Sequence, residues 1–396
     1  MVVSGDYSIC DKCIILFNGL LKSTPASEIV PSQVAEKKQL VEQLNSIKIR
    51  EFMDQFVIGQ ETAKMAICVS VVNHYKRMLY EHEGSDLNKS NLMITGPSGS
   101  GKSLLVSTVA KFLDVPFIAV DATTLTEAGY IGQNVDTIIT RLLMEANGDI
   151  NAAENGIVFI DEIDKITTKN RATASEAKVS GIQSALLKMV EGTVIPVTLN
   201  PDSKRAPKVV EVNTSNMLFI CGGAFIGMTD IVTTRLKKKK GLGFGDAAVA
   251  ATQNLDAEYV TEDFVEFGMI PEFVGRFPMK THTKELTEVE LLEVLTNAKN
   301  NILAEYKFYF NVDGIDLEFT NDFLERVAHQ AKTEKTGVRG LRSICDAIML
   351  PHLYIIPEYQ KRRVAKVTFH GNCVDKKEIP KIEIFEKKSV AKKTKS

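Results

Sequence analysis

The sequence predicts an α/β fold in which helices flank a parallel β-sheet. From about Ile49 onward, short apolar runs alternate with segments of helical periodicity, and this alternation is typical of a parallel sheet covered by helices. A glycine-rich stretch also stands directly between one of these runs and an amphipathic helix. The predicted strands are Asn91–Thr95, Phe117–Val120, Ile157–Ile160 and Met217–Cys221.

A smaller α+β domain is predicted after about Lys284. Apolar residues there recur on one helical face, and strand-like runs follow near Ile315–Phe319 and Ala365–Phe369. We therefore expect a large domain over residues 49–283, a small domain over 284–386 and a Lys-rich solvated tail over 387–396. The residues of the helical face are Leu291, Leu292, Leu295, Ile302, Leu303 and Tyr306.

Residues 1–48 are expected to form a short Cys-containing segment followed by a linker. Cys10 and Cys13 are the one closely spaced cysteine pair of the sequence. Proline and serine residues in the stretch from Ser23 to Gln33 are typical of a connecting segment.

Composition narrows the class of protein. The chain is 44% hydrophobic and 25% charged with a formal net charge of −2, which indicates an ordinary globular protein and gives no basic surplus for nucleic acid. We find no apolar run of about eighteen residues and no secretory signal, so no membrane partner is expected. Six dispersed cysteines are typical of a reduced protein, and a cytoplasmic or organelle-matrix location is expected.

The glycine-rich stretch, residues 96–103, has the pattern of a phosphate-binding loop. Its glycines allow backbone N–H groups to turn toward phosphate oxygens, while Lys102 supplies a positive charge and the Ser103 hydroxyl can join a Mg²⁺ shell. An accidental glycine-rich turn is the alternative, and the strand before the loop and the helix after it make that reading less favourable.

The strand ending at Ile160 is followed by two carboxylates, Asp161 and Glu162. Taken alone, this pattern is more often a strand that ends in a solvated turn. Paired with the upstream loop, it predicts a metal-binding carboxylate, Asp161, and a water-activating one, Glu162. The sequence thus predicts an ATPase that uses ATP with Mg²⁺.

From about Ile49 to about Phe369 the chain resembles the bacterial and mitochondrial ClpX unfoldases, a family of AAA+ ATPases. Residues 57–60 resemble the adenine-side segment of that family, residues 268–276 resemble the segment that carries its arginine finger, and residues 337–342 resemble its sensor-2 helix. The resemblance implies an AAA+ P-loop NTPase core that assembles into a ring, with six subunits as the family size.

The resemblance also implies the roles of individual residues. Glu162, Arg276 and Arg339 are the expected catalytic residues, with Arg276 reaching the ATP of a neighbouring subunit. Ser103 and Asp161 are the expected Mg²⁺ ligands. The expected cofactor-binding residues are Val57, Ile58, Gly96, Pro97, Ser98, Gly99, Ser100, Gly101, Lys102, Ser103, Leu104, Asp161 and Arg339.

Two further segments resemble substrate and partner sites of the family. Tyr130 and Ile131 lie in a segment that resembles the first pore loop, which implies a grip on extended polypeptide; a Tyr buried after a tight turn is the alternative reading. Leu242-Gly243-Phe244 aligns with the Ile-Gly-Phe tripeptide that docks a ClpP-type peptidase. The implied partners are therefore the peptidase and unfolded or tagged protein substrates.

The sequence departs from the family in its first residues. The family binds zinc through two Cys-x-x-Cys pairs, whereas this chain has one pair, Cys10 and Cys13. Two thiolates leave half of a tetrahedral zinc shell open. The pair is read either as residual thiols or as half of a zinc site that two subunits complete together.

Two functions remain open from the sequence. The first is an ATP-driven unfoldase that passes its substrates to a ClpP-type peptidase. The second is a peptidase-independent remodelling chaperone, which the altered docking tripeptide leaves open. An ATP-switched scaffold without motor activity is disfavoured, because Glu162 and Arg276 are both present.

Overall fold

The computed structural model describes residues 2–4, 7–9, 44–80, 87–126, 133–167, 176–199, 208–239, 259–299, 301–376 and 378–385. The chain divides into two compact units, Met1–Asn45 and Ser46–Ser396. In the first unit, strand β1 (Val2–Ser4) pairs antiparallel with β2 (Tyr7–Ile9). The second unit holds every other element that follows.

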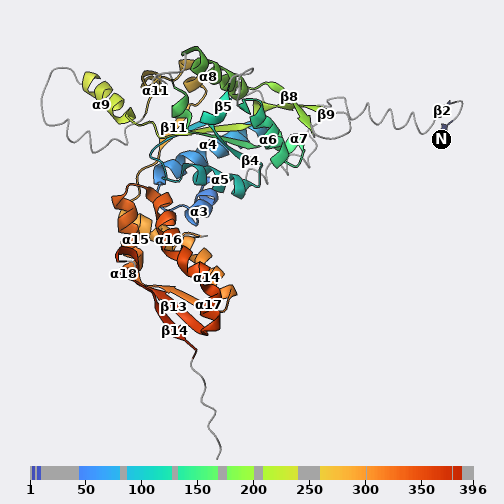
Figure 1. Ribbon diagram of the computed structural model, residues 1–396. Helices are drawn as coiled ribbons and strands as arrows, with labels where there is room; N and C mark the ends of the chain where they lie inside the picture. Colours follow the sequence, from blue (N-terminus) through green and yellow to red (C-terminus); the bar gives the residue numbers. More distant parts are fainter. Residues whose placement is uncertain are drawn as a thin grey trace, which may run out of the picture. The chain divides into compact units, whose positions relative to one another are not determined.

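A parallel five-stranded sheet is the centre of the second unit (Figure 1). Each strand pairs in parallel with its neighbours. In chain order the strands lie fifth, first, fourth, third and second across the sheet. From one edge to the other they are β11 (Met279–His282), β3 (Leu92–Thr95), β10 (Leu218–Gly223), β7 (Ile157–Asp161) and β4 (Phe117–Asp121).

Alternate residues of the central strands enter two different hydrophobic cores. In β7, Ile157 and Phe159 join one core while Val158 and Ile160 join the other, as the two-residue period of a strand requires. The first core lies under helices α3 (Ser46–Asp54), α4 (Glu61–Tyr80) and α5 (Lys102–Leu113). The second lies under α6 (Thr137–Glu145), α7 (Ile150–Glu154), α8 (Glu176–Glu191), α9 (Met228–Lys239), α11 (Thr261–Phe267) and α12 (Pro271–Gly275).

Short elements connect these layers. An antiparallel hairpin of β8 (Val194–Leu199) and β9 (Lys208–Asn213) follows α8. The remaining short elements are the 3-10 turns η2 (Ala122–Thr124), η3 (Ile163–Ile166) and η5 (Thr214–Asn216) and the paired strands β5 (Leu125–Thr126) and β6 (Gln133–Asn134).

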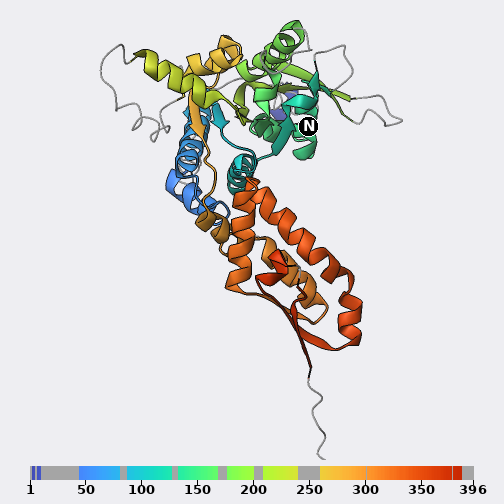
Figure 2. The ribbon, with the colours of Figure 1, turned by 60° about the vertical axis from the view of Figure 1, so that its left-hand side comes forward.

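A third hydrophobic core is formed by residues between Leu286 and Cys373. Its helix α15 packs against both α13 and α16 (Figure 2), and its three-stranded sheet has the order β12-β13-β14. The elements are α13 (Glu288–Thr296), α14 (Ile302–Val312), β12 (Asp316–Phe319), α15 (Asn321–Thr333), α16 (Gly337–Tyr354), α17 (Ile356–Lys361), β13 (Val364–Phe369), α18 (Asn372–Asp375) and β14 (Lys381–Ile384).

The predicted fold class is confirmed, with local differences. The helical face expected from Leu291 to Tyr306 belongs to two helices, because the Asn301 side chain accepts a hydrogen bond from Ala304 N and starts α14 anew. Strands β11 and β14 were not predicted, because both are short and rich in polar residues. The domain limits at residues 48, 283 and 386 stay predictions.

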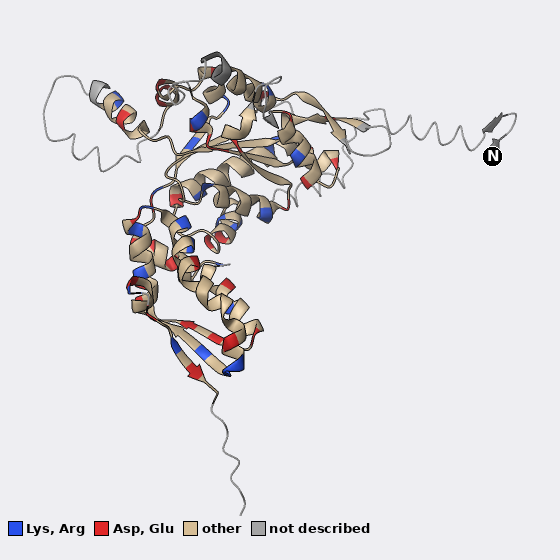
Figure 3. Cartoon of the chain, viewed as in Figure 1, with Lys and Arg blue, Asp and Glu red and all other residues tan. Residues whose placement is uncertain are grey.

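Charged residues of both signs occur along the helices and strands without gathering in one region (Figure 3). Among the described residues, no helix is both long enough and apolar enough to cross a membrane.

Candidate nucleotide site

The predicted phosphate loop connects the buried strand β3 to helix α5 at the carboxyl edge of the central sheet. Gly96, Gly99 and Gly101 all have positive φ angles, of 138°, 77° and 92°, which L-residues with side chains rarely adopt. A Cβ atom at Gly96 would stand 2.2 Å from the Thr283 hydroxyl, whereas one at Gly101 would enter open space. The backbone is therefore bent into a loop that is open at the start of α5, where a helix N-terminus favours an anion.

Lys102 is the first residue of α5 and only 7% of it is exposed. Its Nζ atom donates hydrogen bonds to the carbonyl oxygens of Gly96 (2.7 Å) and Pro97 (2.9 Å). Burial lowers the pKa of this ammonium group, and the carboxylates of Asp161 and Asp164 oppose that shift. The loop thus holds a partly desolvated ammonium group, which phosphate oxygens bound nearby would stabilise.

Ser103 and Asp161 come together although 58 residues separate them. The Ser103 hydroxyl donates to Asp161 Oδ2 at 3.0 Å, and Asp161 Oδ1 accepts from the backbone N–H of Glu162 at 2.9 Å. Hydroxyl and carboxylate oxygens are the ligands that Mg²⁺ prefers. The two side chains predicted to bind this ion therefore lie within reach of a single cation.

Glu162 follows Asp161 with a left-handed backbone, at φ 56° and ψ 31°. This conformation is uncommon for a residue with a side chain, and such strain tends to occur at functional sites. It turns the chain from β7 into η3 and leaves the Glu162 side chain exposed. A carboxylate in this position can accept a proton from a water molecule beside the loop.

Arg339, in the first turn of α16, reaches the same loop. Its Nη1 atom donates to the Ser98 hydroxyl at 3.2 Å. The loop and the helix also meet backbone to backbone, because a Cβ at Gly99 would lie 2.9 Å from the Thr336 carbonyl oxygen and one at Gly337 would lie 3.2 Å from that of Gly99. Helix α16, whose apolar residues lie in the third core, thus contributes a guanidinium group to the loop between β3 and α5.

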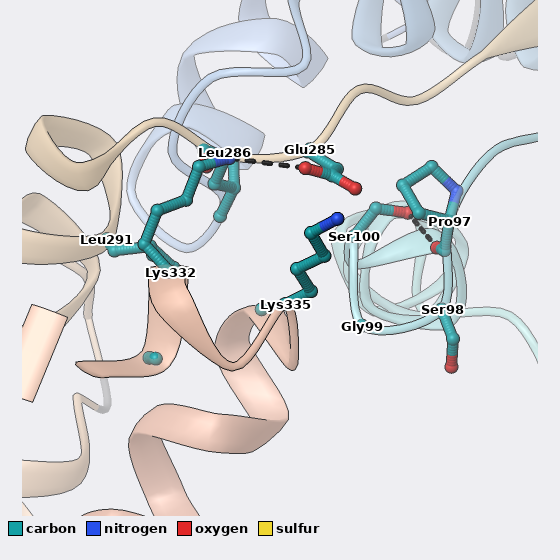
Figure 4. A pocket seen from close by; sticks show the side chains of 11 residues that line it. Pro97, Ser98, Gly99, Ser100, Glu285, Leu286, Leu291, Lys332 and Lys335 are labelled. Atoms are coloured by element: carbon teal, nitrogen blue, oxygen red, sulfur yellow. Dashed lines mark hydrogen bonds and ion pairs between the residues drawn. The ribbon is translucent and has the colours of Figure 1, made fainter. Parts of the chain in front are cut away.

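A narrow cleft separates the loop from α13, α15 and α16 (Figure 4). Lys335 extends toward the loop from the turn before α16, and Lys332 forms an ion pair with Glu285 at 3.2 Å. The cavity has a volume of about 30 Å³, far less than the several hundred that small-molecule pockets provide. A nucleotide base and ribose can enter it only if its two walls move apart.

Gln60 lies behind the loop and was not predicted as a site residue. Its side chain is 8% exposed, and the Nε2 atom donates to the carbonyl oxygens of Ser100 (3.2 Å) and Lys284 (2.7 Å). Its Oε1 atom accepts from Lys284 N at 2.9 Å. One amide therefore ties the phosphate loop to the segment through which the chain enters the third core.

The predicted adenine-side residues precede Gln60. Val57 is 5% exposed and belongs to the core under α3, α4 and α5, while Ile58 is half-buried. Pro97 and Gly99 line the cleft with Ser98 and Ser100, and Leu104 is 46% exposed on α5.

Arg276 lies where the strands of the central sheet begin (the amino edge), whereas the loop lies where they end (the carboxyl edge). Its carbonyl oxygen accepts a hydrogen bond (3.0 Å) from Asn91 Nδ2, at the start of β3, whereas Gly96 follows the end of that strand. Asn91 and Gly96 are five positions apart along extended chain, a span of roughly 16 Å. The structure thus brings Lys102, Ser103, Asp161, Glu162 and Arg339 together and leaves Arg276 apart from them.

The surroundings of Arg276 are rich in positive charge. It lines a cavity of about 410 Å³ together with Arg77 and Lys89, and its guanidinium group pairs with Glu191. Burial and, to a smaller extent, the nearby Arg77 lower the pKa of Lys89 to about 7. Lys89 Nζ donates to the carbonyl oxygens of Val190 (2.9 Å) and Thr214 (2.8 Å).

Several predicted site residues lie outside the described residues. These are Cys10 and Cys13, the pore residues Tyr130 and Ile131, and the docking residues Leu242, Gly243 and Phe244. Within the ranges that the structure describes, no three His, Cys, Asp or Glu side chains are grouped as a metal cluster would require.

Comparisons with known proteins show which proteins this chain is similar to. The family model described as "AAA domain (Cdc48 subfamily)" matches residues 87–280, which include the phosphate loop, Asp161 and Arg276. Several relatives carry the name ATP-dependent Clp protease ATP-binding subunit ClpX. The protein from Treponema denticola is 39% identical over 97% of this chain and 93% of its own length. The protein from Borrelia duttonii is 38% identical over 93% of this chain and 86% of its own length. The protein from Porphyromonas gingivalis is 39% identical over 89% of this chain and 87% of its own length.

Proposed function

The chain belongs to the ClpX family of AAA+ ATPases, and we propose that it unfolds protein substrates with the energy of ATP hydrolysis and delivers them to a ClpP-type peptidase. One observation carries the proposal. The side chains of Lys102, Ser103, Asp161 and Arg339 converge on one phosphate loop, in a chain that matches Clp protease subunits over almost its whole length.

The nucleotide chemistry divides among these residues. The loop N–H groups and Lys102 bind the phosphates. Ser103 and Asp161 would hold Mg²⁺, which would supply positive charge to the phosphate oxygens. Glu162 accepts a proton from the attacking water, and Arg339 binds phosphate from the side of α16. Val57 and Ile58 contact the base.

Arg276 completes the site of a neighbouring subunit. Its distance from its own phosphate loop, at the other edge of the sheet, favours action on a second copy of the chain. A ring of identical subunits, six in the family, presents each Arg276 to the next nucleotide. Hydrolysis therefore depends on assembly.

Substrate handling is assigned from the resemblance alone. Tyr130 and Ile131 grip extended polypeptide in the axial channel, and Leu242-Gly243-Phe244 docks the peptidase. A cytoplasmic or organelle-matrix location belongs to the same proposal.

The experiment that tests this function is degradation of a tagged, stably folded substrate by the purified chain with ATP, with and without a ClpP-type peptidase. We expect degradation only when ATP and peptidase are both present. Deleting residues 242–244 removes degradation and leaves ATP hydrolysis nearly unchanged. An absence of ATP-dependent unfolding under every condition argues against the motor itself.

A second candidate function is a remodelling chaperone that works without a peptidase. It is favoured by the Leu242 of the docking tripeptide, where the family has Ile. Substrate unfolding without any binding of a ClpP-type peptidase is the result that selects this candidate.

For the amino-terminal pair we propose substantially less than one zinc ion per chain, since Cys10 and Cys13 supply two of four ligands. Metal analysis of the purified chain tests this, and one tightly held zinc per chain contradicts it. Half a zinc per chain indicates a site completed by two subunits.

A further inference from the structure

We propose that Gln183 and Glu191, two side chains of helix α8, position Arg276 for hydrolysis. The inference rests on the proposed function, in which Arg276 acts on ATP bound by a neighbouring subunit. Both are positioning residues, since they contact Arg276 or the short helix before it and not the nucleotide.

Gln183 holds the start of that short helix. Its side chain is fully buried; Oε1 accepts from Ile270 N at 2.9 Å and Nε2 donates to the Ile166 carbonyl oxygen at 2.8 Å. A backbone N–H can only donate and a carbonyl can only accept, so these partners fix the orientation of the amide. Ile166 ends η3, which begins directly after Glu162.

Helix α12 cannot hold Arg276 in place by itself. It spans five residues, Pro271–Gly275, with Ile270 before it and Arg276 after it, and a helix this short has little stability of its own. Its direction is therefore set at its two ends. Gln183 fixes Ile270, and Asn91 Nδ2 binds the Arg276 carbonyl oxygen.

Glu191 sets the direction of the guanidinium group. Arg276 Nε and Nη2 both donate to Glu191 Oε1, at 2.9 and 2.6 Å. The two side chains are 54% and 38% exposed, so solvent screens the pair and its strength is modest. Such a pair orients the guanidinium group of Arg276 and can still be exchanged for phosphate oxygens.

One helix therefore carries both contacts. Gln183 and Glu191 lie eight residues apart on α8, roughly 12 Å along its axis. Gln183 also ties α8 to η3 and thus to the strand end that bears Asp161 and Glu162. The position of Arg276 is fixed relative to the central sheet from three sides, through Gln183, Glu191 and Asn91.

The test uses mixed rings made from two inactive full-length variants. Arg276→Ala subunits keep the catalytic carboxylate, and Glu162→Gln subunits keep the arginine, so hydrolysis in the mixture comes from Arg276→Ala sites that face a Glu162→Gln neighbour. Gln183→Met, which preserves side-chain size and removes both hydrogen bonds, is then added to one partner or to the other.

We expect an asymmetric effect. Gln183→Met in the Glu162→Gln subunit, which supplies the arginine, lowers the rate roughly 10- to 100-fold, the range that small misplacements of a catalytic group produce. The same change in the Arg276→Ala subunit changes the rate less than about twofold, because that subunit has no arginine to position. Gln330→Met, whose amide bonds Glu334 within α15, is the matched control and changes neither mixture.

Equal losses from the two placements overturn the positioning role and assign Gln183 to its own site or to folding. A starting mixture that never hydrolyses ATP overturns the action of Arg276 between subunits, and the inference with it. If Gln183→Met does not assemble, Glu191→Gln decides, since this half-exposed carboxylate is not part of a core. It should slow hydrolysis only when it is placed in the subunit that keeps Arg276.

Discussion

The carboxyl and amino edges of the central sheet carry different groups of the proposed active site. At the carboxyl edge, Ser103, Asp161 and Lys102 contact one another or the phosphate loop within one subunit. At the amino edge, Arg276 has a carboxylate partner, Glu191, and cationic neighbours, Arg77 and Lys89. The first edge resembles a nearly complete nucleotide site. The second presents the positive charge that such a site lacks, which supports the proposal that a catalytic set is shared between two subunits.

The two edges also differ in the surroundings of two lysines, Lys102 and Lys89. Burial lowers the pKa of both Lys102 and Lys89. At the carboxyl edge the carboxylates of Asp161 and Asp164 oppose the shift, whereas at the amino edge Arg77 adds to it and the pKa of Lys89 falls to about 7. Both ammonium groups donate to backbone carbonyl oxygens, but only Lys102 has carboxylates nearby that favour its charged form.

Removing Arg276 should have the largest effect. Arg276→Ala rings are expected to lose hydrolysis by about 10³-fold or more, the range known for arginine fingers, while affinity for a non-hydrolysable ATP analogue stays near the wild-type value. Steady-state ATPase and equilibrium binding measure the two quantities. Reduced binding with unchanged turnover would place Arg276 in its own subunit's site.

The carboxyl edge is tested by Glu162→Gln. Hydrolysis should fall by about two to four orders of magnitude because a positioned base is lost, and ATP binding and ring assembly should persist. Glu145→Gln, on the exposed side of α6, is the control and should hydrolyse ATP at the wild-type rate. Near-normal turnover of Glu162→Gln would remove this residue from the mechanism.

Lys102→Met is expected to weaken ATP binding roughly 10- to 100-fold, since charge-assisted hydrogen bonds to phosphate are lost. Lys89→Met, the equivalent change at the amino edge, should leave ATP affinity unchanged. Titration of both variants with a fluorescent ATP analogue measures the difference. Equal affinities in the two variants would erase the distinction between the edges.

The smallest effect concerns stability at the amino edge. Lys89 has a folded-state pKa of about 7 against an ordinary value of 10.5, so the unfolded chain binds more protons between these values and stability rises with pH across that window. The destabilising contribution is complete below about pH 7 and is relieved above it. Lys89→Met should therefore flatten the pH dependence by at most about 1.4 kcal/mol per pH unit. Denaturant midpoints between about pH 7 and about pH 9 measure this slope, and parallel slopes in both proteins would contradict it.

The local sequence pattern was enough to predict the strands, the phosphate loop and the carboxylates that follow β7. The apolar runs gave four of the sheet strands, and the glycine spacing from Gly96 to Gly101 located the loop that joins β3 to α5. The adjacent carboxylates predicted the end of β7, where Asp161 meets the Ser103 hydroxyl. Each of these features is encoded by neighbouring residues.

The features that the sequence did not predict depend on contacts between residues far apart in the chain. Gln60 binds Lys284 across 224 positions, and Gln183 binds Ile270 across 87. The neighbours of each glutamine in the sequence do not encode these contacts, because they arise only when the fold buries the amide beside distant backbone N–H and carbonyl groups. Strand β11 was not predicted for a related reason, because its sequence, Met-Lys-Thr-His, forms a strand only by pairing with β3.

The claim that one active site takes its arginine from the opposite edge of a second subunit is tested most directly by a mixing series. Arg276→Ala and Glu162→Gln subunits are combined in varying proportions at constant total concentration, and the ATPase rate is measured. If sites are shared, the rate is near zero for either variant alone and passes through a maximum near equal proportions, at roughly a quarter of the wild-type rate for random assembly. A rate that stays near zero at every proportion would contradict the account.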